Sequence, residues 1–170
     1  SETLGKKAPA EAVILFDGTD VAVWESRKKP EEAVRWKITD EGELEVVSFV
    51  NGKKAKQDLK TKAVFGDYHL HLEFNLYYEP AAKGMGRSNS GIFHHGVYET
   101  QILDSFGQPG ANNDCGGIYK QHEPDVNAGY PAGVWQTYDI DLKAPRFDSN
   151  GKKTEDARMY VRLYCVLVHD

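Results

Sequence analysis

The chain has 170 residues, of which 40% are hydrophobic and 28% charged, a composition typical of a globular domain with a hydrophobic core. Its formal net charge of -5 provides no overall positive field to attract nucleic acid. No apolar run approaches the roughly 20 residues that a membrane-spanning helix needs. Composition therefore argues against nucleic-acid-binding and membrane-spanning proteins, and it leaves the oligomeric state open.

The first third of the chain carries only short apolar segments. Residues 1–12 are polar and predict a disordered or extended N-terminal lead, followed by a single β-sandwich domain over residues 13–170. Residues 34–38 and 44–46 alternate between apolar and polar side chains on either side of an acidic turn. This pattern predicts a β-hairpin with its apolar side chains buried.

The clearest predicted strand covers residues 68–76. Its apolar and polar side chains alternate strictly, which is typical of an antiparallel strand with one buried face and argues against a helix. The polar face is either solvated or able to ligate a metal, because residues two apart share a face. The apolar face consists of Leu70, Leu72, Phe74 and Leu76, and the polar face of His69, His71, Glu73 and Asn75.

Further strand-like segments follow at residues 98–104, 115–120, 135–142 and 159–168. Loops rich in Gly, Pro and Asn separate them, and no amphipathic helix longer than two turns is evident. Many short strands joined by such turns predict an all-β protein, either a sandwich or a jelly roll.

Two cysteines, Cys115 and Cys165, lie far apart in the sequence and lack the spacing of metal ligands. They could form one disulfide in an oxidising compartment, or they could be two unrelated thiols. The sequence leaves both alternatives open.

Residues 88–104 concentrate the polar chemistry of the chain. Within this stretch Tyr98, Thr100 and Ile102 alternate with Glu99 and Gln101. If the first set faces the core, Glu99 and Gln101 stand side by side on an open sheet surface. A carboxylate and an amide there could bind a hydroxyl-rich ligand, or the carboxylate could accept a proton. The alternative is an ordinary solvated strand face.

His94 and His95 directly precede this strand and offer acid–base capacity near neutral pH. Because consecutive strand residues point to opposite faces, only one of them can share a pocket with Glu99. Parity favours His95, unless a bend near Gly96 reorients both rings. The other histidine is then expected to be buried and structural.

No Gly-rich phosphate loop, GxSxG elbow or HExxH motif occurs in the chain. The remaining candidates are polar and aromatic residues on strands and nearby loops. Aromatic rings beside carboxylates and amides suit a sugar, whose C–H faces stack on rings while its hydroxyls need donors and acceptors. These candidates are Arg87, His94, His95, Glu99, Gln101, Asp104, Tyr119, Lys120, Gln121, His122, Trp135 and Gln136.

Six motifs in order resemble the 3-keto-disaccharide hydrolase family, also called domain of unknown function 1080. The resemblance implies a concanavalin-like jelly-roll β-sandwich of two antiparallel sheets, frequently exported to the bacterial periplasm or cell surface. It also implies activity on glycosides already oxidised to a ketone at C3. The motifs are Leu15-Phe-Asp-Gly-Thr-Asp20 with Trp24, Phe65-Gly-Asp-Tyr68, Asn89-Ser-Gly-Ile92, Tyr98-Glu-Thr-Gln-Ile-Leu-Asp104, Gly116-Gly-Ile-Tyr119 and Trp135-Gln-Thr-Tyr-Asp-Ile140.

The chemistry that the resemblance implies is hydrolysis of 3-keto-glycosides, by β-elimination followed by hydration. A base removes the proton at C2, an acid assists the leaving oxygen at C1, and a donor or a divalent metal polarises the ketone. A non-catalytic carbohydrate-binding module is the alternative function on the same fold. The predicted catalytic residues are Glu99, His95, His94 and Asp104, and the predicted substrate-binding residues are Arg87, Gln101, Tyr119, Lys120, Trp135 and Gln136.

Two features depart from the family pattern. Family members usually continue past residue 170 with another β segment, so a final strand is expected to be missing here. In addition, Tyr164 and Cys165 occupy positions where an Asn-Gly hairpin turn is expected. Neither residue readily adopts a positive φ, so the sequence does not decide whether a hairpin turn forms there.

Overall fold

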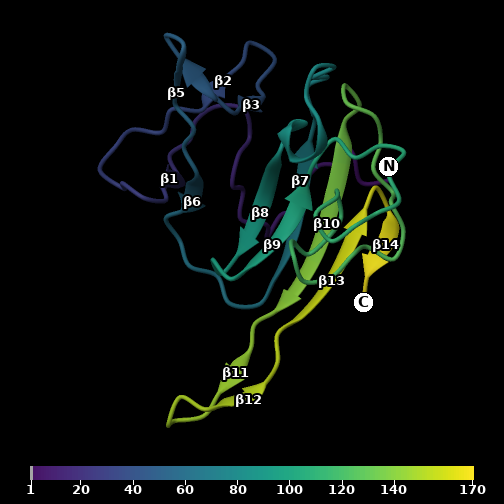
Figure 1. The fold of residues 1–170 in the computed structure, drawn as a ribbon. Coiled ribbons are helices and arrows are strands. Elements are labelled where there is room, and N and C mark those ends of the chain that lie inside the picture. Colours follow the sequence, from purple (N-terminus) through teal and green to yellow (C-terminus); the bar gives the residue numbers. More distant parts are fainter. Residues whose placement is uncertain (1) are drawn as a thin grey trace. The chain divides into compact units, whose positions relative to one another are not determined.

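The computed structural model describes residues 2–170, which form short β-strands, one 3-10 turn (η1, Gly84–Gly86) and connecting loops (Figure 1). Two compact units are present, and each is described by itself. One comprises residues 7–65, and the other comprises residues 2–6 together with residues 66–170. Within the described residues no helix is long and apolar enough to cross a membrane.

The unit of residues 7–65 contains three small antiparallel ladders. The predicted hairpin is confirmed but shorter, because only two residues of each strand are paired. Two indole N–H groups tie the loops together, Trp24 donating to the carbonyl of Leu15 and Trp36 to that of Gln57. The ladders pair β1 (Trp24–Ser26) with β6 (Leu59–Thr61), β2 (Lys37–Ile38) with β3 (Leu44–Glu45), and β4 (Phe49–Val50) with β5 (Lys53–Lys54).

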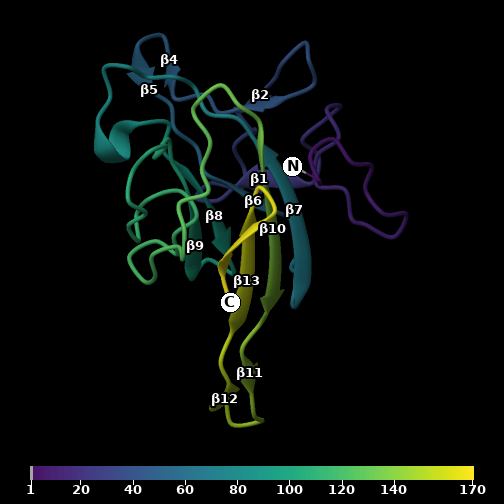
Figure 2. The same ribbon diagram turned by 90° about the vertical axis from the view of Figure 1, so that its right-hand side faces the viewer.

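The second unit is built on a four-stranded antiparallel sheet in the order β14-β13-β10-β7 (Figure 2). The strict alternation predicted for residues 68–76 is confirmed in β7. On β10, Tyr138, Ile140 and Leu142 are at most 2% exposed on the inner face, but Thr137 and Asp139 on the other face are also buried, at 0% and 7%. The strands are β7 (Tyr68–Phe74), β10 (Gln136–Lys143), β13 (Arg158–Leu163) and β14 (Val166–His169).

A second layer faces this sheet and completes the predicted β-sandwich. It consists of the antiparallel hairpin of β8 (Ser90–His94) and β9 (Tyr98–Ile102), to which Ile118 adds a bridge with Thr100. The core lies between the two layers. It contains Phe74, Leu76, Ile102, Cys115, Ile118, Tyr138, Ile140, Val161, Leu163 and Val168.

The alternation of apolar and polar residues does not predict two of the hairpins. β11 (Arg146–Phe147) and β12 (Lys153–Glu155) extend beyond the four-stranded sheet as a continuation of β10 and β13 (Figures 1 and 2). The turn between β13 and β14 forms at Tyr164 and Cys165, with φ of 50° and 71°. Two positive φ values are the conformation that Asn-Gly adopts easily, so both residues are strained there.

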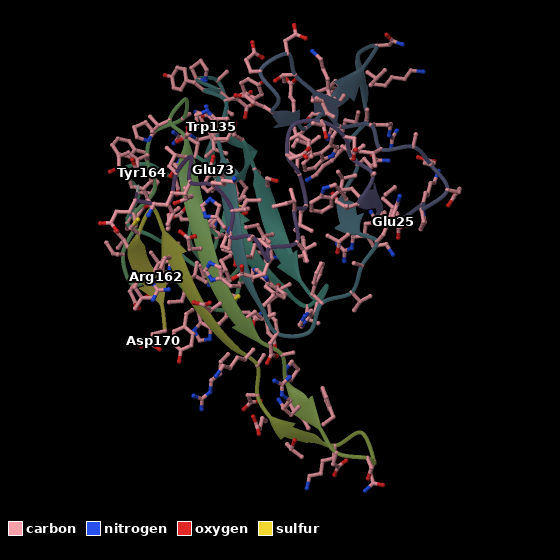
Figure 3. All side chains as sticks on the ribbon, turned by 180° about the vertical axis from the view of Figure 1, so that it is seen from behind. Glu25, Glu73, Trp135, Arg162, Tyr164 and Asp170 are labelled. Atoms are coloured by element: carbon pink, nitrogen blue, oxygen red, sulfur yellow. The ribbon has the colours of Figure 1, made fainter. Side chains whose placement is uncertain are left out.

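The outer face of the four-stranded sheet carries the polar side chains of β7, paired with those of β10 (Figure 3). Nδ1 of His69 lies 2.8 Å from Asp141, and Nδ1 of His71 lies 2.7 Å from Asp139. From the predicted N-terminal lead, the Thr3 hydroxyl donates to Asp139 at 2.9 Å. Across residues 2–170, no three His, Cys, Asp or Glu side chains are grouped so that they could hold a metal. The histidines of β7 therefore form ion-pair and hydrogen-bond contacts with the neighbouring strand.

The two cysteines do not pair. Cys115 is buried, its N–H accepted by the Ser105 hydroxyl, whereas Cys165 is exposed in the β13–β14 turn. Burial raises the pKa of the Cys115 thiol. Of the two alternatives, the structure therefore has unrelated thiols, one of them packed in the core.

Candidate functional site

The hairpin of β8 and β9 presents two different faces. Thr100 and Ile102 are buried toward the core, as predicted. On the other face the Glu99 side chain is half-buried and folds over Gly91 on the neighbouring strand. A Cβ at Gly91 would lie 2.1 Å from Oε1 of Glu99 and 2.8 Å from its Cγ and Cδ. Glycine at this position is therefore what allows the carboxylate to lie flat against the sheet.

The prediction that Gln101 stands exposed beside Glu99 is wrong. Gln101 is 1% exposed, and its side-chain oxygen accepts the N–H of Ile102 at 3.0 Å. Its backbone carbonyl accepts the Tyr138 hydroxyl at 2.6 Å and the N–H of Gly116 at 3.2 Å. Residues 116–119 pair with the backbone of β9, and the Gln101 side chain is buried, so it is not open to a ligand.

An ion pair lies beyond the open end of the hairpin, where Arg87 precedes β8 and Asp104 follows β9. Arg87 donates from Nε at 3.2 Å and from Nη2 at 2.7 Å to the same oxygen of Asp104. The Asp104 side chain is 4% exposed and that of Arg87 is 28% exposed. Both residues line a pocket of about 120 Å³, together with Gly84, Leu103, Ser105, Gln108 and Asp114. The guanidinium is therefore fixed by a buried carboxylate while it remains reachable by a ligand.

Tyr119 and Lys120 lie on the other side of β9. The N–H of Tyr119 donates to the carbonyl of Glu99 at 2.8 Å, and Nζ of Lys120 lies 5.1 Å from the centre of the Tyr119 ring. Since Ile118 opposite Thr100 points into the core, alternation places the Tyr119 side chain on the Glu99 face. The sequence motif at residues 116–119 thus pairs with the backbone of β9 at Glu99, and Lys120 follows it directly.

The two histidines lie apart from this face. His94 is fully buried on the core side, with Nδ1 2.6 Å from the Tyr68 hydroxyl and Nε2 2.9 Å from the Thr100 hydroxyl. His95, Gly96 and Val97 form the turn of the hairpin, with φ of 51° at His95 and 71° at Gly96. That turn reorients the His95 ring, which lies edge-on to Tyr68 with Nε2 3.1 Å from the carbonyl of Gly66. Strand parity does not extend through such a turn.

His94 is expected to make the protein less stable in acid. Burial, and secondarily the charge of His95, lowers the pKa of His94 from 6.5 to about 4. As pH falls through this window the unfolded chain binds a proton that the folded protein does not, so the free energy of unfolding falls by about 3 kcal/mol. Urea unfolding at pH 7 and pH 4.5 measures the loss.

The comparison needs two variants, because carboxylates also titrate in acid. His94→Gln should show a smaller fall in stability between the two pH values than the wild type. His69→Gln, which changes an exposed ring, should fall as the wild type does. Equal pH dependence in His94→Gln and the wild type would show that His94 is not buried in its neutral form.

Gln136 is the first residue of β10 in the four-stranded sheet. Gln136 is fully buried, and its side-chain amide bonds both backbone groups of Tyr130, accepting at 2.8 Å and donating at 3.3 Å. Trp135 directly precedes it, at the start of β10 (Figure 3). Gln121 and His122 are exposed beyond Tyr119. Of the predicted residues, the structure gathers Arg87, Glu99, Asp104, Tyr119 and Lys120 along β9 and its neighbouring segments.

The chain is a β-sandwich of the kind found in glycosyl hydrolases. It resembles a crystal structure from Parabacteroides distasonis ATCC 8503, provisionally assigned as a glycosyl hydrolase, with 35% sequence identity and a TM-score of 0.84. The match covers 96% of this chain and 66% of the other. A second structure with the same assignment and source is 15% identical with a TM-score of 0.60, covering 92% of this chain and 69% of that one, and it shows the fold alone.

Residues 11–160 match the sequence profile of the 3-keto-alpha-glucoside-1,2-lyase-like domain, and the chain belongs to this family. No curated protein matches the chain significantly. The family assignment confirms the resemblance drawn from the six sequence motifs.

Proposed function

We propose that this domain cleaves 3-keto-glycosides on the face of β8 and β9, with Glu99 as the base. The observations that carry the proposal are the half-buried Glu99 carboxylate lying over Gly91 and the Arg87–Asp104 pair in the segments that flank the same hairpin. A carboxylate and a fixed guanidinium are the two charges that an elimination next to a ketone requires. Membership of the 3-keto-glucoside lyase-like family supports this substrate class.

The proposed reaction has two steps. Glu99 takes the proton from C2, which the neighbouring C3 ketone acidifies, and the electron pair forms the C1–C2 double bond as the C1–O bond breaks. The leaving oxygen takes a proton from a donor, a role that we assign to Tyr119 or Lys120 because the backbone of Tyr119 pairs with that of Glu99. Water then adds across the double bond at C1 and C2, so the net reaction is hydrolysis.

Arg87 is assigned to the ketone oxygen, on which negative charge develops when C2 loses its proton. Asp104 is a positioning residue, because it is buried and holds the guanidinium through two hydrogen bonds to one oxygen. A divalent metal is an alternative way to polarise the ketone. Among residues 2–170, no three His, Cys, Asp or Glu side chains are grouped as ligands for such a metal.

Deuterium incorporation tests the proposed route. A 3-keto-glycoside incubated with the protein in D2O should release its aglycone and yield a 3-keto sugar that carries deuterium at C2 beyond the level of an enzyme-free control. Cleavage without deuterium at C2 would contradict elimination and favour direct displacement at C1. Binding of the glycoside without cleavage would instead favour a carbohydrate-binding module.

Gly91→Ala is expected to remove activity without unfolding the protein. The new methyl group would occupy the place of the Glu99 carboxylate, which must rotate away from the sheet. We expect kcat to fall by about 10²-fold or more, because misplacing a catalytic group by roughly 1 Å has that cost. Steady-state kinetics and thermal unfolding together check this.

Gly86→Ala is a matched control, since a Cβ there meets only the Ala82 methyl group at 3.9 Å. It should retain wild-type turnover. Wild-type activity in Gly91→Ala would show that the position of Glu99 over Gly91 is not needed.

A further inference from the structure

A second cavity, of about 310 Å³, lies away from the Glu99 face. It is lined by Phe106, Tyr130, Tyr164 and Val166 and by the backbone stretch 127–129. We refer to it as the aromatic cleft. The function proposed above uses none of these residues.

The aromatic cleft exposes ring surface that a folded protein would usually bury. Phe106 is 53% exposed and Tyr130 is 41% exposed. The Tyr130 and Tyr164 rings are 4.4 Å apart between centroids and tilted by 54°, so they pack against each other, and both line the cleft. Rings set at such an angle offer flat apolar surfaces, and the phenol hydroxyls add polar groups at their rims.

Two side-chain amides, those of the buried Gln136 and the half-buried Asn127, hold the segments that carry the aromatic rings of the cleft. Gln136, which is fully buried, bonds the N–H and the carbonyl of Tyr130. Asn127 donates to the carbonyls of Ser105 at 2.9 Å and Gln108 at 2.8 Å, which fixes the loop that carries Phe106. The aromatic surfaces are therefore preorganised, which lowers the entropy cost of binding a ligand.

Tyr164 occupies its place in spite of backbone strain. Its φ is 50° and that of Cys165 is 71°, at a turn where Asn and Gly would be unstrained. Such strain persists where the surroundings impose it, and it is concentrated at functional sites. The strained turn places the Tyr164 ring in the lining of the cleft.

We propose that the aromatic cleft is a second carbohydrate subsite, which binds an unoxidised pyranose ring through its C–H faces. The ligand class rests on the proposed function. One loop connects the two places, because Ser105 and Gln108 line the Arg87–Asp104 pocket while Phe106 lines the cleft. A ring held in the cleft would therefore lie on the loop that also borders the reaction face.

The test is an NMR titration of the whole chain with maltose, trehalose and cellobiose in turn. At least one disaccharide should give saturable shifts of the Gly129 and Tyr164 amides. Tyr164→Asn should weaken that binding by about tenfold, the loss expected when one aromatic contact is removed. Since Asn tolerates a positive φ, this variant should unfold at or above the wild-type temperature.

Two further variants keep the test decisive. Cys165→Gly relaxes the same turn but keeps the ring, and it should bind as the wild type does. Phe106→Ser removes an exposed ring from a loop and should also weaken binding, which covers the case in which Tyr164→Asn does not fold. The proposal is overturned if no disaccharide shifts the cleft amides, or if all three variants bind equally well.

Failure of the proposed function would look different. Glu99→Gln should lose turnover and keep the cleft shifts. If the wild-type protein shows the cleft shifts but cleaves no 3-keto-glycoside, the proposed subsite is supported and the proposed enzymatic activity is contradicted. If the protein turns over a 3-keto-glycoside but shows no cleft shifts, only the proposed subsite is contradicted.

Discussion

Glu99→Gln is expected to lower kcat for a 3-keto-glycoside by about 10²- to 10⁴-fold, the usual contribution of a general base. The amide has the size and shape of the carboxylate, so it should still lie over Gly91, but it cannot accept the C2 proton. Steady-state kinetics on one 3-keto-glycoside measure the loss, and KM should change much less than kcat.

Glu155→Gln is the control for this change of charge. It alters an exposed glutamate on β12, in the hairpin that extends from the sheet. Its turnover should equal that of the wild type. Full activity in Glu99→Gln would remove the role assigned to Glu99, whatever the family membership of the chain.

Arg87→Met is expected both to destabilise the protein and to abolish turnover. It leaves the carboxylate of Asp104, 4% exposed, without the guanidinium that neutralises it. Removing one partner of a buried pair costs about 3–5 kcal/mol, and we expect about 3 because Arg87 is 28% exposed. Urea unfolding gives the free energy of unfolding, and kinetics at a temperature where the variant is folded give the activity.

The chain offers a matched arginine at its surface. Arg146 pairs with Asp67, and both side chains are more than two-fifths exposed, at 48% and 43%. Arg146→Met should therefore cost less than about 1 kcal/mol and leave activity unchanged. Similar losses of stability in the two variants would show that burial of Asp104 does not dominate the energetics of the first pair.

The strands with strict alternation could be predicted from sequence, because one buried face forces a period of two. β7 is such a strand, and it forms one edge of the four-stranded sheet beside β10. β11 and β12 gave no such signal, since their residues are exposed on both sides. That residues 7–65 form a separate compact unit could not be predicted from a local sequence pattern, because it depends on contacts between residues far apart in the sequence.

For the candidate site, the sequence predicts only what the alternation of side chains along one strand determines. Glu99 followed from alternation along β9. The burial of Gln101 did not, since it depends on tertiary contacts that alternation along one strand does not contain. The orientation of His95 depends on a turn with two positive φ values, and the pairing of Arg87 with Asp104 depends on a loop closing beside the hairpin. The sequence motifs marked these residues without showing what each one contacts.

The most direct test of the central claim compares a 3-keto-disaccharide with its unoxidised parent as substrates for the wild-type chain, with and without a chelator. Cleavage of the ketone form alone is the predicted result, because only the ketone acidifies the proton that Glu99 is assigned to remove. Persistence of that cleavage in the chelator would agree with a reaction carried by the chain's own residues. Equal cleavage of both sugars, or of neither, would contradict the proposed function.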